Sequence, residues 1–457
     1  MRRERKRRSP TDEQRPAGVI GNAPARVLTL LDSTSLIVGI IVGAGIYQMA
    51  PDVAKGVEGP WGLLGIWTLG GLLSLCGALC YAELAAAYPH QGGDYVYLKR
   101  AYGDWAGFLF GWVQLAIVRP GDIAVMAFAF ATYATALHDP LQGVAPEWTE
   151  RLFAAGAAVL LTAINVLGVR QGKWAQNLLT GAKVAGLLLI VATAVAVPGT
   201  DAVQGPAETL PFGLALIFVL FSFGGWNEMA YVAAEVRHPE RNIARALVLG
   251  TAAVTVLYLL VNAAFLHVLG HAGMAASKAV ATDTVATAFP NAAAVLVSAL
   301  ICVSALGAVN GLVFTGARIS YALGRDHPLF ARVGQWHPRL GTPAAALLLQ
   351  GVLAVLLILA LGSFLAAVLY TAAAVYAFYL ATTAAVLVLR RREPDRPRPF
   401  RVPFYPLPPL VFGITCALLI WSAIDYKPTA ALASGLLTLL GLVVWRIDRR
   451  LSPGRTG

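Results

Sequence analysis

Long apolar segments occupy most of this chain and restrict what it can fold into. Roughly 17 to 25 mainly apolar residues cross the hydrocarbon core of a bilayer as a helix. Backbone polar groups in lipid need internal hydrogen-bond partners, so segments of this length fold as helices. The sequence predicts an all-α integral membrane protein with twelve spans, at residues 28–56, 60–88, 104–137, 149–169, 173–197, 211–235, 243–270, 292–324, 343–361, 363–389, 405–425 and 428–445.

Composition agrees with this class. The 457 residues are 58% hydrophobic and only 13% charged, with a mean hydropathy of +0.67. A soluble domain carries about 25% charged residues. The connectors between the predicted spans are short, so there is no room for a separate soluble domain, and the lipid bilayer is the expected partner of most of the surface.

The basic residues lie almost entirely on one side of the predicted spans. If the N-terminus is cytosolic, the only Lys and Arg residues placed outside are Lys55, Arg151, Lys278 and Lys427. This bias follows the positive-inside rule and predicts a multi-pass protein of the cytoplasmic membrane with both termini cytosolic. The net charge of +11 is then a consequence of topology, and no nucleic-acid partner is expected.

Two of the apolar segments are interrupted by glycine-rich stretches. Ile41-Val42-Gly43-Ala44-Gly45-Ile46 lies within the first, and Ser222-Phe223-Gly224-Gly225-Trp226 lies within the sixth. Glycine weakens a helix and lets the backbone approach a ligand closely. Irregular backbone at membrane depth occurs where it is buried in protein or lines a cavity. Two interruptions five spans apart indicate an inverted-repeat transporter.

The topology extends this into a domain organisation. The first span enters from the cytosol and the sixth from outside, so spans 1–5 and 6–10 have opposite orientations. The expected parts are a disordered basic cytosolic tail (1–26), a first inverted repeat (27–198), a second inverted repeat (199–392), a Pro/Arg cytosolic linker (393–404), and two further spans with a cytosolic C-terminus (405–457).

Each interruption exposes one helix C-terminus and one helix N-terminus near the middle of the bilayer. Amide N–H groups at a helix N-terminus attract a carboxylate, and carbonyl groups at a C-terminus attract an ammonium group. A site that offers both suits a zwitterion. An amino acid is therefore the expected small-molecule substrate.

Motifs around the interruptions resemble those of the amino acid–polyamine–organocation superfamily. They are Gly43-Ala44-Gly45-Ile46, Tyr81-Ala82-Glu83-Leu84, the stretch from Pro89 to Tyr95 with Tyr97-Leu98, and Ala101-Tyr102-Gly103. Arg119-Pro120, Gly224-Gly225-Trp226-Asn227, Glu235 with Arg241-Asn242-Ile243, and Val309-Asn310-Gly311 are similar to its L-type amino acid transporter branch. The resemblance covers residues 26 to 450. It implies a LeuT-type 5+5 inverted repeat with helices 1 and 6 broken and two extra C-terminal helices.

The resemblance also implies roles for the residues at the interruptions. The amides of Ala44 and Gly45 would bind the substrate carboxylate. Carbonyls near Ile41, Phe221 and Phe223 would bind the amino group of the substrate, and the Phe221 ring would be an aromatic gate. The substrate side chain would lie among Ser222, Gly224 and Gly225, with Gly43 and Asn227 beside them. Small residues also serve close helix packing in any membrane bundle. The repeat-equivalent positions favour binding over packing alone.

Lys183 lies deep in the fifth predicted span, about 15 Å from its cytosolic end at 1.5 Å per residue. An ionisable residue inside the membrane is costly and is a functional hypothesis by default. The matching lysine of the L-type branch occupies the place of a bound sodium ion. Its ammonium would join carbonyls of Gly39 and Val42 to Ser304, which predicts sodium-independent transport. A proton-linked role for Lys183 stays open, since burial lowers the pKa of a lysine.

Two acids depart from the pattern of relatives that carry neutral amino acids. Asp122 follows Arg119 at i+3, and Glu228 lies just beyond the second interruption. Asp122 pairs with Arg119 on one helix face in one interpretation. In the other, one acid faces the substrate and favours a cationic side chain, or takes part in proton coupling. Because one arginine cannot neutralise two carboxylates, we expect a functional role for Glu228.

The remaining ionisable residues are mostly structural candidates. Glu83, Asp94, Glu235 and Arg241 lie at predicted cytosolic helix ends, where we expect gating or capping ion pairs. No histidine or cysteine spacing is typical of a metal site, and no cofactor is expected. The loop at 137–150 has no cysteine. Members that join a glycoprotein subunit do so through a cysteine there, so no disulfide-linked heavy subunit is expected.

The sequence therefore predicts a sodium-independent secondary transporter of L-amino acids that works by alternating access, as an exchanger or a proton-linked carrier. A carrier of cationic amino acids or polyamines is the alternative. A channel would show a repeated pore-lining motif, and a membrane-embedded enzyme would show a converging nucleophile or metal set. Neither is found in the sequence.

Overall fold

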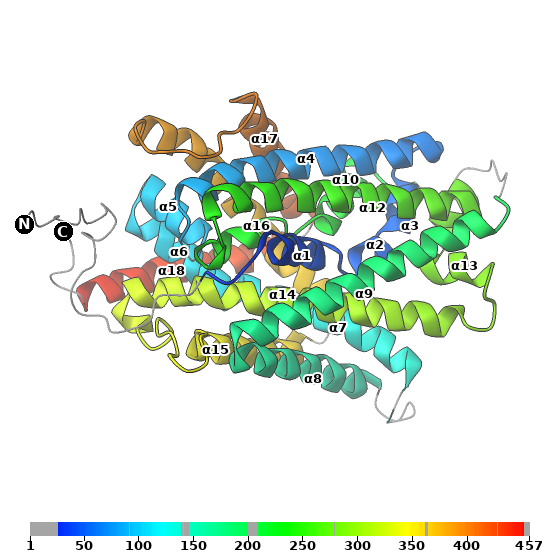
Figure 1. Ribbon diagram of the computed structural model, residues 1–457, viewed down its shortest axis with the longest axis horizontal. Helices are drawn as coiled ribbons and strands as arrows, with labels where there is room; N and C mark the ends of the chain where they lie inside the picture. The colour runs from blue at the N-terminus through cyan, green and yellow to red at the C-terminus, as the bar shows by residue number, and fades with distance from the viewer. Residues whose placement is uncertain are drawn as a thin grey trace, which may run out of the picture.

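A computed structural model describes residues 26–90, 92–138, 140, 146–199, 209–277, 279–361, 364–426 and 428–451. In this part of the chain the regular structure is helical, apart from two isolated β-bridges. Most long helices run along the long axis of the molecule (Figure 1). The helices are α1 (Leu30–Ile41), α2 (Gly45–Gln48), α3 (Ala50–Lys55), α4 (Gly59–Ala87), α5 (Asp94–Tyr102), α6 (Asp104–Val113), η1 (Gln114–Val118), α7 (Arg119–Leu137), α8 (Pro146–Leu167), α9 (Val169–Ala196), α10 (Phe212–Ser222), α11 (Glu228–Tyr231), η2 (Ala233–Glu235), α12 (Pro239–Ala276), α13 (Val280–Ala286), α14 (Ala293–Asp326), η3 (Pro328–Phe330), α15 (Ala344–Leu361), α16 (Phe364–Arg392), α17 (Leu407–Tyr426) and α18 (Pro428–Arg450).

Every predicted span corresponds to helical structure. Among the described residues, ten helices are long and apolar enough to cross a membrane, and two shorter apolar helices, Phe212–Ser222 and Ala344–Ala360, fall in the sixth and ninth predicted spans. The all-α prediction is confirmed. Residues 1–25, which make up nearly all of the predicted cytosolic tail, lie outside the described residues. The short helices α5 and α13 were not predicted.

The first span is interrupted where the glycines predict it. Helix α1 begins at a capping box, in which Thr29 and Asp32 each accept a hydrogen bond from the other's backbone amide. It ends at Ile41, and helical structure resumes at Gly45. Lys173 and Asn177 of α9 both donate to the Asp32 carboxylate, at 3.1 and 2.7 Å. These bonds attach the start of α1 to α9 and thereby fix the position of the helix that precedes the interruption.

The sixth span is interrupted at the second glycine pair. Helix α10 ends at Ser222, and α11 begins at Glu228. Gly225 has a φ of 108°, a conformation that residues with a side chain rarely adopt. Between the two helices the chain passes through turns, so the peptide groups there are not committed to a helix.

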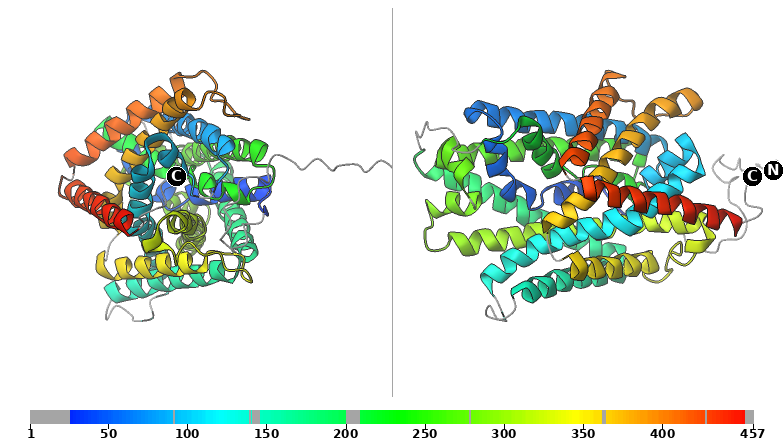
Figure 2. Two further views of the ribbon diagram at one scale, coloured as in Figure 1. Left: turned by 90° about the vertical axis from the view of Figure 1, so that its left-hand side faces the viewer. Right: turned by 180° about the vertical axis from the view of Figure 1, so that it is seen from behind.

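The interrupted helices lie inside the bundle, and the last two helices lie outside it. Helix α1 packs against α9, α11, α12 and α14, whereas α17 packs mainly on α16 and α4, and α18 on α6 and α16. Viewed along the long axis, α17 and α18 are at the periphery (Figure 2). The two C-terminal helices therefore cover the core without contributing to its centre.

Two of the expected ion pairs join distant segments at one end of the molecule. We call this end the arginine-rich face; it contains the helix ends Tyr102, Asp326, Arg392 and Arg450. Glu83 of α4 pairs with Arg390 of α16 and accepts from the backbone amide of Val402 in the linker at 2.7 Å. Glu235 pairs with Arg318 of α14 at 2.8 Å. Asp94 forms no ion pair with any described residue, so for Asp94 that expectation was wrong.

Candidate substrate site at the two interrupted helices

The two interruptions contact each other directly. A Cβ atom on Gly45 would lie 3.0 Å from the Ser222 hydroxyl oxygen and 3.2 Å from the Ser222 Cα. A Cβ on Gly225 would lie 2.6 Å from the Ile40 side chain. Gly225, with its positive φ, has no room for a side chain, and a side chain at Gly45 would fit only if Ser222 shifted by a few tenths of an ångström. The structure thus brings the two predicted halves of the site together.

Tyr258 of α12 links the two interruptions by hydrogen bonds. Its hydroxyl lies 3.0 Å from the Ile41 carbonyl and 3.1 Å from the Ser222 carbonyl, and its side chain is fully buried. The ring also packs against Phe223 and Trp67. The sequence did not predict a role for this residue, because a single tyrosine in an apolar span is expected to be a packing residue of the core.

The first interruption presents unpaired amide groups. In the described structure, the backbone N–H groups of Ala44 and Gly45 have no hydrogen-bond acceptor, although both residues are buried. A buried N–H without a partner is costly. These two donors therefore need an acceptor from a ligand or water, which is what the carboxylate prediction requires.

The carbonyl groups at the site differ in the number of hydrogen bonds that they already accept. The Ile41 carbonyl accepts from the Gly43 amide at 2.7 Å and from Tyr258 at 3.0 Å. The Phe221 carbonyl accepts from the Gly224 amide, at 2.9 Å, and from the Phe223 amide, whereas the Phe223 carbonyl has no donor in the described structure. Carbonyl oxygens accept two bonds. Phe223 thus has more capacity for an ammonium group than Ile41 or Phe221.

The residues predicted to surround the substrate side chain take different positions. Phe221 is partly exposed, whereas Phe223 is fully buried against Trp67 and Tyr258. The Ser222 hydroxyl donates to the Phe218 carbonyl of its own helix. A Cβ on Gly224 would meet only the Phe221 carbonyl oxygen, at 3.1 Å. Room for a substrate group is thus found beside Gly224, next to the partly exposed Phe221.

Lys183 makes the three contacts that the sequence predicts. Its ammonium donates to the carbonyls of Gly39 and Val42 at 2.6 Å each and to the Ser304 carbonyl at 2.7 Å, and its side chain is fully buried. The Ser304 hydroxyl also donates to the Val42 carbonyl, at 3.0 Å. One cation thus holds the end of α1, the first interruption and α14 together.

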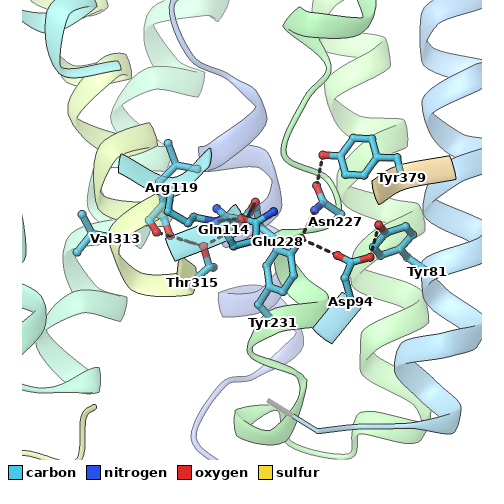
Figure 3. A network of polar contacts seen from close by, with 12 residues as sticks. Tyr81, Asp94, Gln114, Arg119, Asn227, Glu228, Tyr231, Val313, Thr315 and Tyr379 are labelled. Atoms are coloured by element: carbon cyan, nitrogen blue, oxygen red, sulfur yellow. Dashed lines mark hydrogen bonds and ion pairs between the residues drawn. The ribbon is translucent and has the colours of Figure 1, made fainter. Parts of the chain in front are cut away.

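A buried ion pair lies just beyond the second interruption. Arg119 donates to both carboxylate oxygens of Glu228, at 2.8 and 2.7 Å, and both side chains are at most 4% exposed. Thr315 also donates to Glu228, and Gln114 accepts from the Arg119 Nε at 2.9 Å. Figure 3 shows the guanidinium and carboxylate groups facing each other. A π-helical turn over Gln114–Val118 precedes Arg119 in span 3.

Asp122 forms no direct ion pair with Arg119 in the described structure, although the guanidinium still acts on it electrostatically. The Arg119 guanidinium is bound by Glu228 and Gln114, which come into reach from α11 and from the π-helical turn. Asp122 is partly buried and has no hydrogen bond or ion pair with a described residue. Among the described residues, the acid without a direct partner is therefore Asp122, not Glu228.

Asn227 belongs to a chain of hydrogen bonds that leads away from the interruption (Figure 3). Its amide nitrogen donates to the Tyr231 hydroxyl and its amide oxygen accepts from Tyr379 of α16, both at 2.8 Å. The Tyr231 hydroxyl in turn donates to Asp94 at 2.6 Å, and Tyr81 donates to the other oxygen of Asp94. Two tyrosine hydroxyls thus occupy one donor and one acceptor position of the Asn227 amide, which leaves one of each.

Potential metal ligands do not gather in the described structure. In the described ranges no group of three or more His, Cys, Asp and Glu residues is placed to hold a metal ion. The four cysteines, Cys76, Cys80, Cys302 and Cys416, are free thiols.

Two interrupted helices that meet inside a helical membrane bundle are the arrangement of a secondary transporter. The chain matches the amino acid permease family over residues 28–445. It belongs to this family, within the amino acid–polyamine–organocation superfamily, and is a multi-pass amino acid transporter rather than an enzyme.

Similar proteins come from animals and bacteria. The b(0,+)-type amino acid transporter 1 of Mus musculus is 31% identical over 425 residues, which are 91% of this chain and 86% of the relative. The Serine/threonine exchanger SteT of Bacillus subtilis (strain 168) is 30% identical over 428 residues, 92% of this chain and 95% of the relative. The Large neutral amino acids transporter small subunit 2 of Mus musculus is 31% identical over 438 residues, 93% and 81% respectively.

The Arg119–Glu228 pair predicts a structural role for Glu228. Glu228→Gln leaves a buried guanidinium without its counter-charge, which costs about 3–5 kcal/mol. We expect a clearly lower melting temperature and an unchanged ranking of ligands in a thermal-shift assay. Thr315→Val is the matched control, since it removes one hydrogen bond to the same carboxylate, worth about 1.5–3 kcal/mol, but leaves the counter-charge of Arg119 in place. A changed ligand ranking with an unchanged melting temperature would place Glu228 at the substrate instead.

Proposed function

We propose that this protein is a sodium-independent secondary transporter of L-amino acids that works by alternating access. It would be an exchanger or a proton-linked carrier in the cytoplasmic membrane, with the arginine-rich face and both termini cytosolic. In this proposal residues 27–198 and 199–392 are the inverted repeats of a LeuT-type fold. Residues 393–404 are the cytosolic linker, and residues 405–457 are the appended part.

The contact between the two interruptions carries this proposal. The unpaired amides of Ala44 and Gly45 supply donors for a carboxylate, and the Phe223 carbonyl supplies an acceptor for an ammonium group. These opposite groups lie on spans whose backbones touch at Gly45 and Ser222. An α-amino acid is small enough to satisfy both groups at once. The family membership and the exchanger named among the relatives agree with this substrate class.

Lys183 supports independence from sodium. Its ammonium already supplies a fixed positive charge among the carbonyls of Gly39, Val42 and Ser304. Those carbonyls belong to two spans that must move relative to each other if access alternates. Lys183 would then take the structural place of a sodium ion and would be part of the moving contact.

The first test is uptake by proteoliposomes. Replacing external sodium by choline should leave saturable amino acid uptake unchanged, because the cation site is filled by Lys183. Lys183→Ala should reduce transport more than it reduces ligand binding, since it separates spans 1 and 8 without altering the amides of Ala44 and Gly45.

Lys173→Ala is the matched control for that experiment. It removes a lysine from the same helix, but one that is half-buried, bonded to Asp32 and not bonded to the carbonyls at the interruption. Its effect on uptake should be much smaller. Strict dependence of the unmodified protein on sodium would refute the role given to Lys183, and a lack of saturable flux of any amino acid would refute the transport proposal.

A second candidate function is transport of cationic amino acids or polyamines. The observation that favours it is Asp122, a partly buried carboxyl group with no hydrogen bond or ion pair to a described residue, three residues after Arg119 in the span that packs on α14. A bound cationic side chain would give Asp122 the counter-charge that Arg119 gives Glu228. Gly43 of the first interruption faces Met126, one helical turn beyond Asp122.

Asp122→Asn tests this candidate. A hydrogen bond to a charged group is worth about 1.5–3 kcal/mol, so the affinity for arginine or lysine relative to a neutral amino acid should fall by roughly tenfold to a hundredfold. Competition binding with both ligand classes measures this ratio. Glu228→Gln is the comparison, because that acid is already paired. Equal loss for both ligand classes would favour a neutral amino acid as the substrate.

The transporter is also proposed to act without a disulfide-linked subunit. The connection at 137–150 has no cysteine, although residues 139 and 141–145 lie outside the described residues. The free cysteines lie on the helices α4, α14 and α17 and not in that connection.

A further inference from the structure

Asp94 is a buried carboxyl group that no described cation neutralises. Its side chain is 1% exposed at the start of α5, outside the membrane-spanning helices, and it forms no ion pair. Its oxygens accept from two hydroxyl groups, those of Tyr81 and Tyr231. Burying an unpaired carboxylate is expensive, so such a group either takes up a proton or stays ionised at a cost.

The turn before Asp94 is fastened to the second half of the broken span. The Gly92 amide donates to the Tyr231 carbonyl at 3.1 Å. A Cβ on Gly93 would lie 2.7 Å from the Tyr231 ring and 3.1 Å from the Ala230 carbonyl carbon. Gly92 and Gly93 both have positive φ, at 98° and 46°, which favours glycine. Because Asp94 is bonded to Tyr81 of α4 and to Tyr231 of α11, α11 cannot move away from α4 without breaking one of these two hydrogen bonds.

The same hydrogen-bonded chain reaches the predicted substrate site. Tyr231 accepts from Asn227, and Asn227 accepts from Tyr379 of α16. Asn227 directly follows the second interruption. A change at Asp94 thus has a continuous path of hydrogen bonds to the place where α10 ends and α11 begins (Figure 3).

We propose that Asp94 is a proton-binding site whose occupancy is tied to closure of the arginine-rich face. The inference rests on the proposed alternating-access function. With α11 against α4 and α5 the carboxyl group is dry and holds a proton. When α11 moves away, the group is hydrated and releases that proton to the solution on this side.

The charged surroundings agree with this role. Five titratable groups of the described structure face Asp94. Tyr81 and Tyr231 are bonded to it, and Tyr379 is next in the chain of hydrogen bonds. The other two are Tyr97 of α5 and Glu228, which is paired with Arg119. The other charged side chains of α5 are paired: Lys99 pairs with Asp104 and Asp326, and Arg100 pairs with Glu393. Burial raises the pKa of Asp94 to about 6, even though the hydroxyls of Thr382, Tyr231 and Tyr81 favour its ionised form.

The direction of the pH effect follows from linkage. A hydrated aspartate has a pKa of about 3.9, so the closed arrangement binds the proton more tightly than the open one. Acid therefore favours closure, and this preference is lost as the pH rises through about 6. From these two pKa values, opening should become roughly tenfold more favourable between about pH 5 and pH 7.5.

Amide hydrogen exchange of the full-length protein in lipid nanodiscs tests the proposal. After correction for the intrinsic rate, exchange of residues 228–237 should rise roughly tenfold from about pH 5 to pH 7.5. Asp94→Asn cannot ionise, so its exchange should stay flat at the acid value. Tyr231→Phe removes a donor to the ionised form and should move the midpoint to higher pH. Asp104→Asn, on the same face but outside this chain of bonds, should keep the unmodified profile.

Two results would overturn the inference. One is a pH-independent exchange rate in the unmodified protein. The other is an unmodified pH profile in Asp94→Asn or, if that variant does not fold, an unmoved midpoint in Tyr231→Phe. Both can occur while amino acid uptake is normal, whereas a failure of the proposed transport function is a lack of uptake at every pH. The two ideas therefore fail separately.

Discussion

The satisfaction of backbone groups at the two interruptions is the constraint on which this structure depends. Interrupting a helix inside a membrane leaves peptide groups without partners, and no water in the hydrocarbon replaces them. Lys183 and Ser304 bind the carbonyls that α1 leaves free, and Tyr258 binds one carbonyl from each interruption. The helices packed around the interruptions hold the side chains of Lys183, Ser304 and Tyr258 at the centre of the bundle.

Some backbone amides and some acidic side chains have no hydrogen-bond acceptor or counter-charge among the described residues, and they indicate where a ligand binds. The amides of Ala44 and Gly45 have no acceptor in the described part of the chain, although they lie beside groups that are fully bonded. Among the buried charges, Arg119 with Glu228 and Arg318 with Glu235 are paired across different helices. Asp94, which is buried, and Asp122, which is partly buried, form no ion pair with any residue that the structure describes. The unpaired amides and the unpaired acids are therefore the groups to which we assign substrate and proton binding.

Much of this could be predicted from the sequence, because the strongest signals are local. Apolar length defines the spans, and two glycine pairs locate the interruptions to within a few residues. Lys183 stands out because an ionisable residue in a long apolar run has few explanations. Its contacts with Gly39, Val42 and Ser304 came from a family resemblance, and the structure contains them.

The predictions that were wrong or not made concern contacts between helices. Helical spacing placed Asp122 next to Arg119, but it gives no information on Glu228, which reaches the same guanidinium from α11. Tyr258 has no local signal, because its two partners come from spans 1 and 6. Asp94 was expected to form an ion pair at a helix end, yet two tyrosines from α4 and α11 surround it. Identifying each of these partners requires the tertiary structure.

The central claim is that one amino acid lies across both interruptions. The most direct measurement is an electron cryomicroscopy structure of the protein in nanodiscs with the amino acid that stabilises it most. We predict density for the carboxylate within hydrogen-bonding distance of the Ala44 and Gly45 amides, and density for the amino group against the Phe223 carbonyl. An amino acid bound elsewhere, with those amides still lacking an acceptor, would contradict the account.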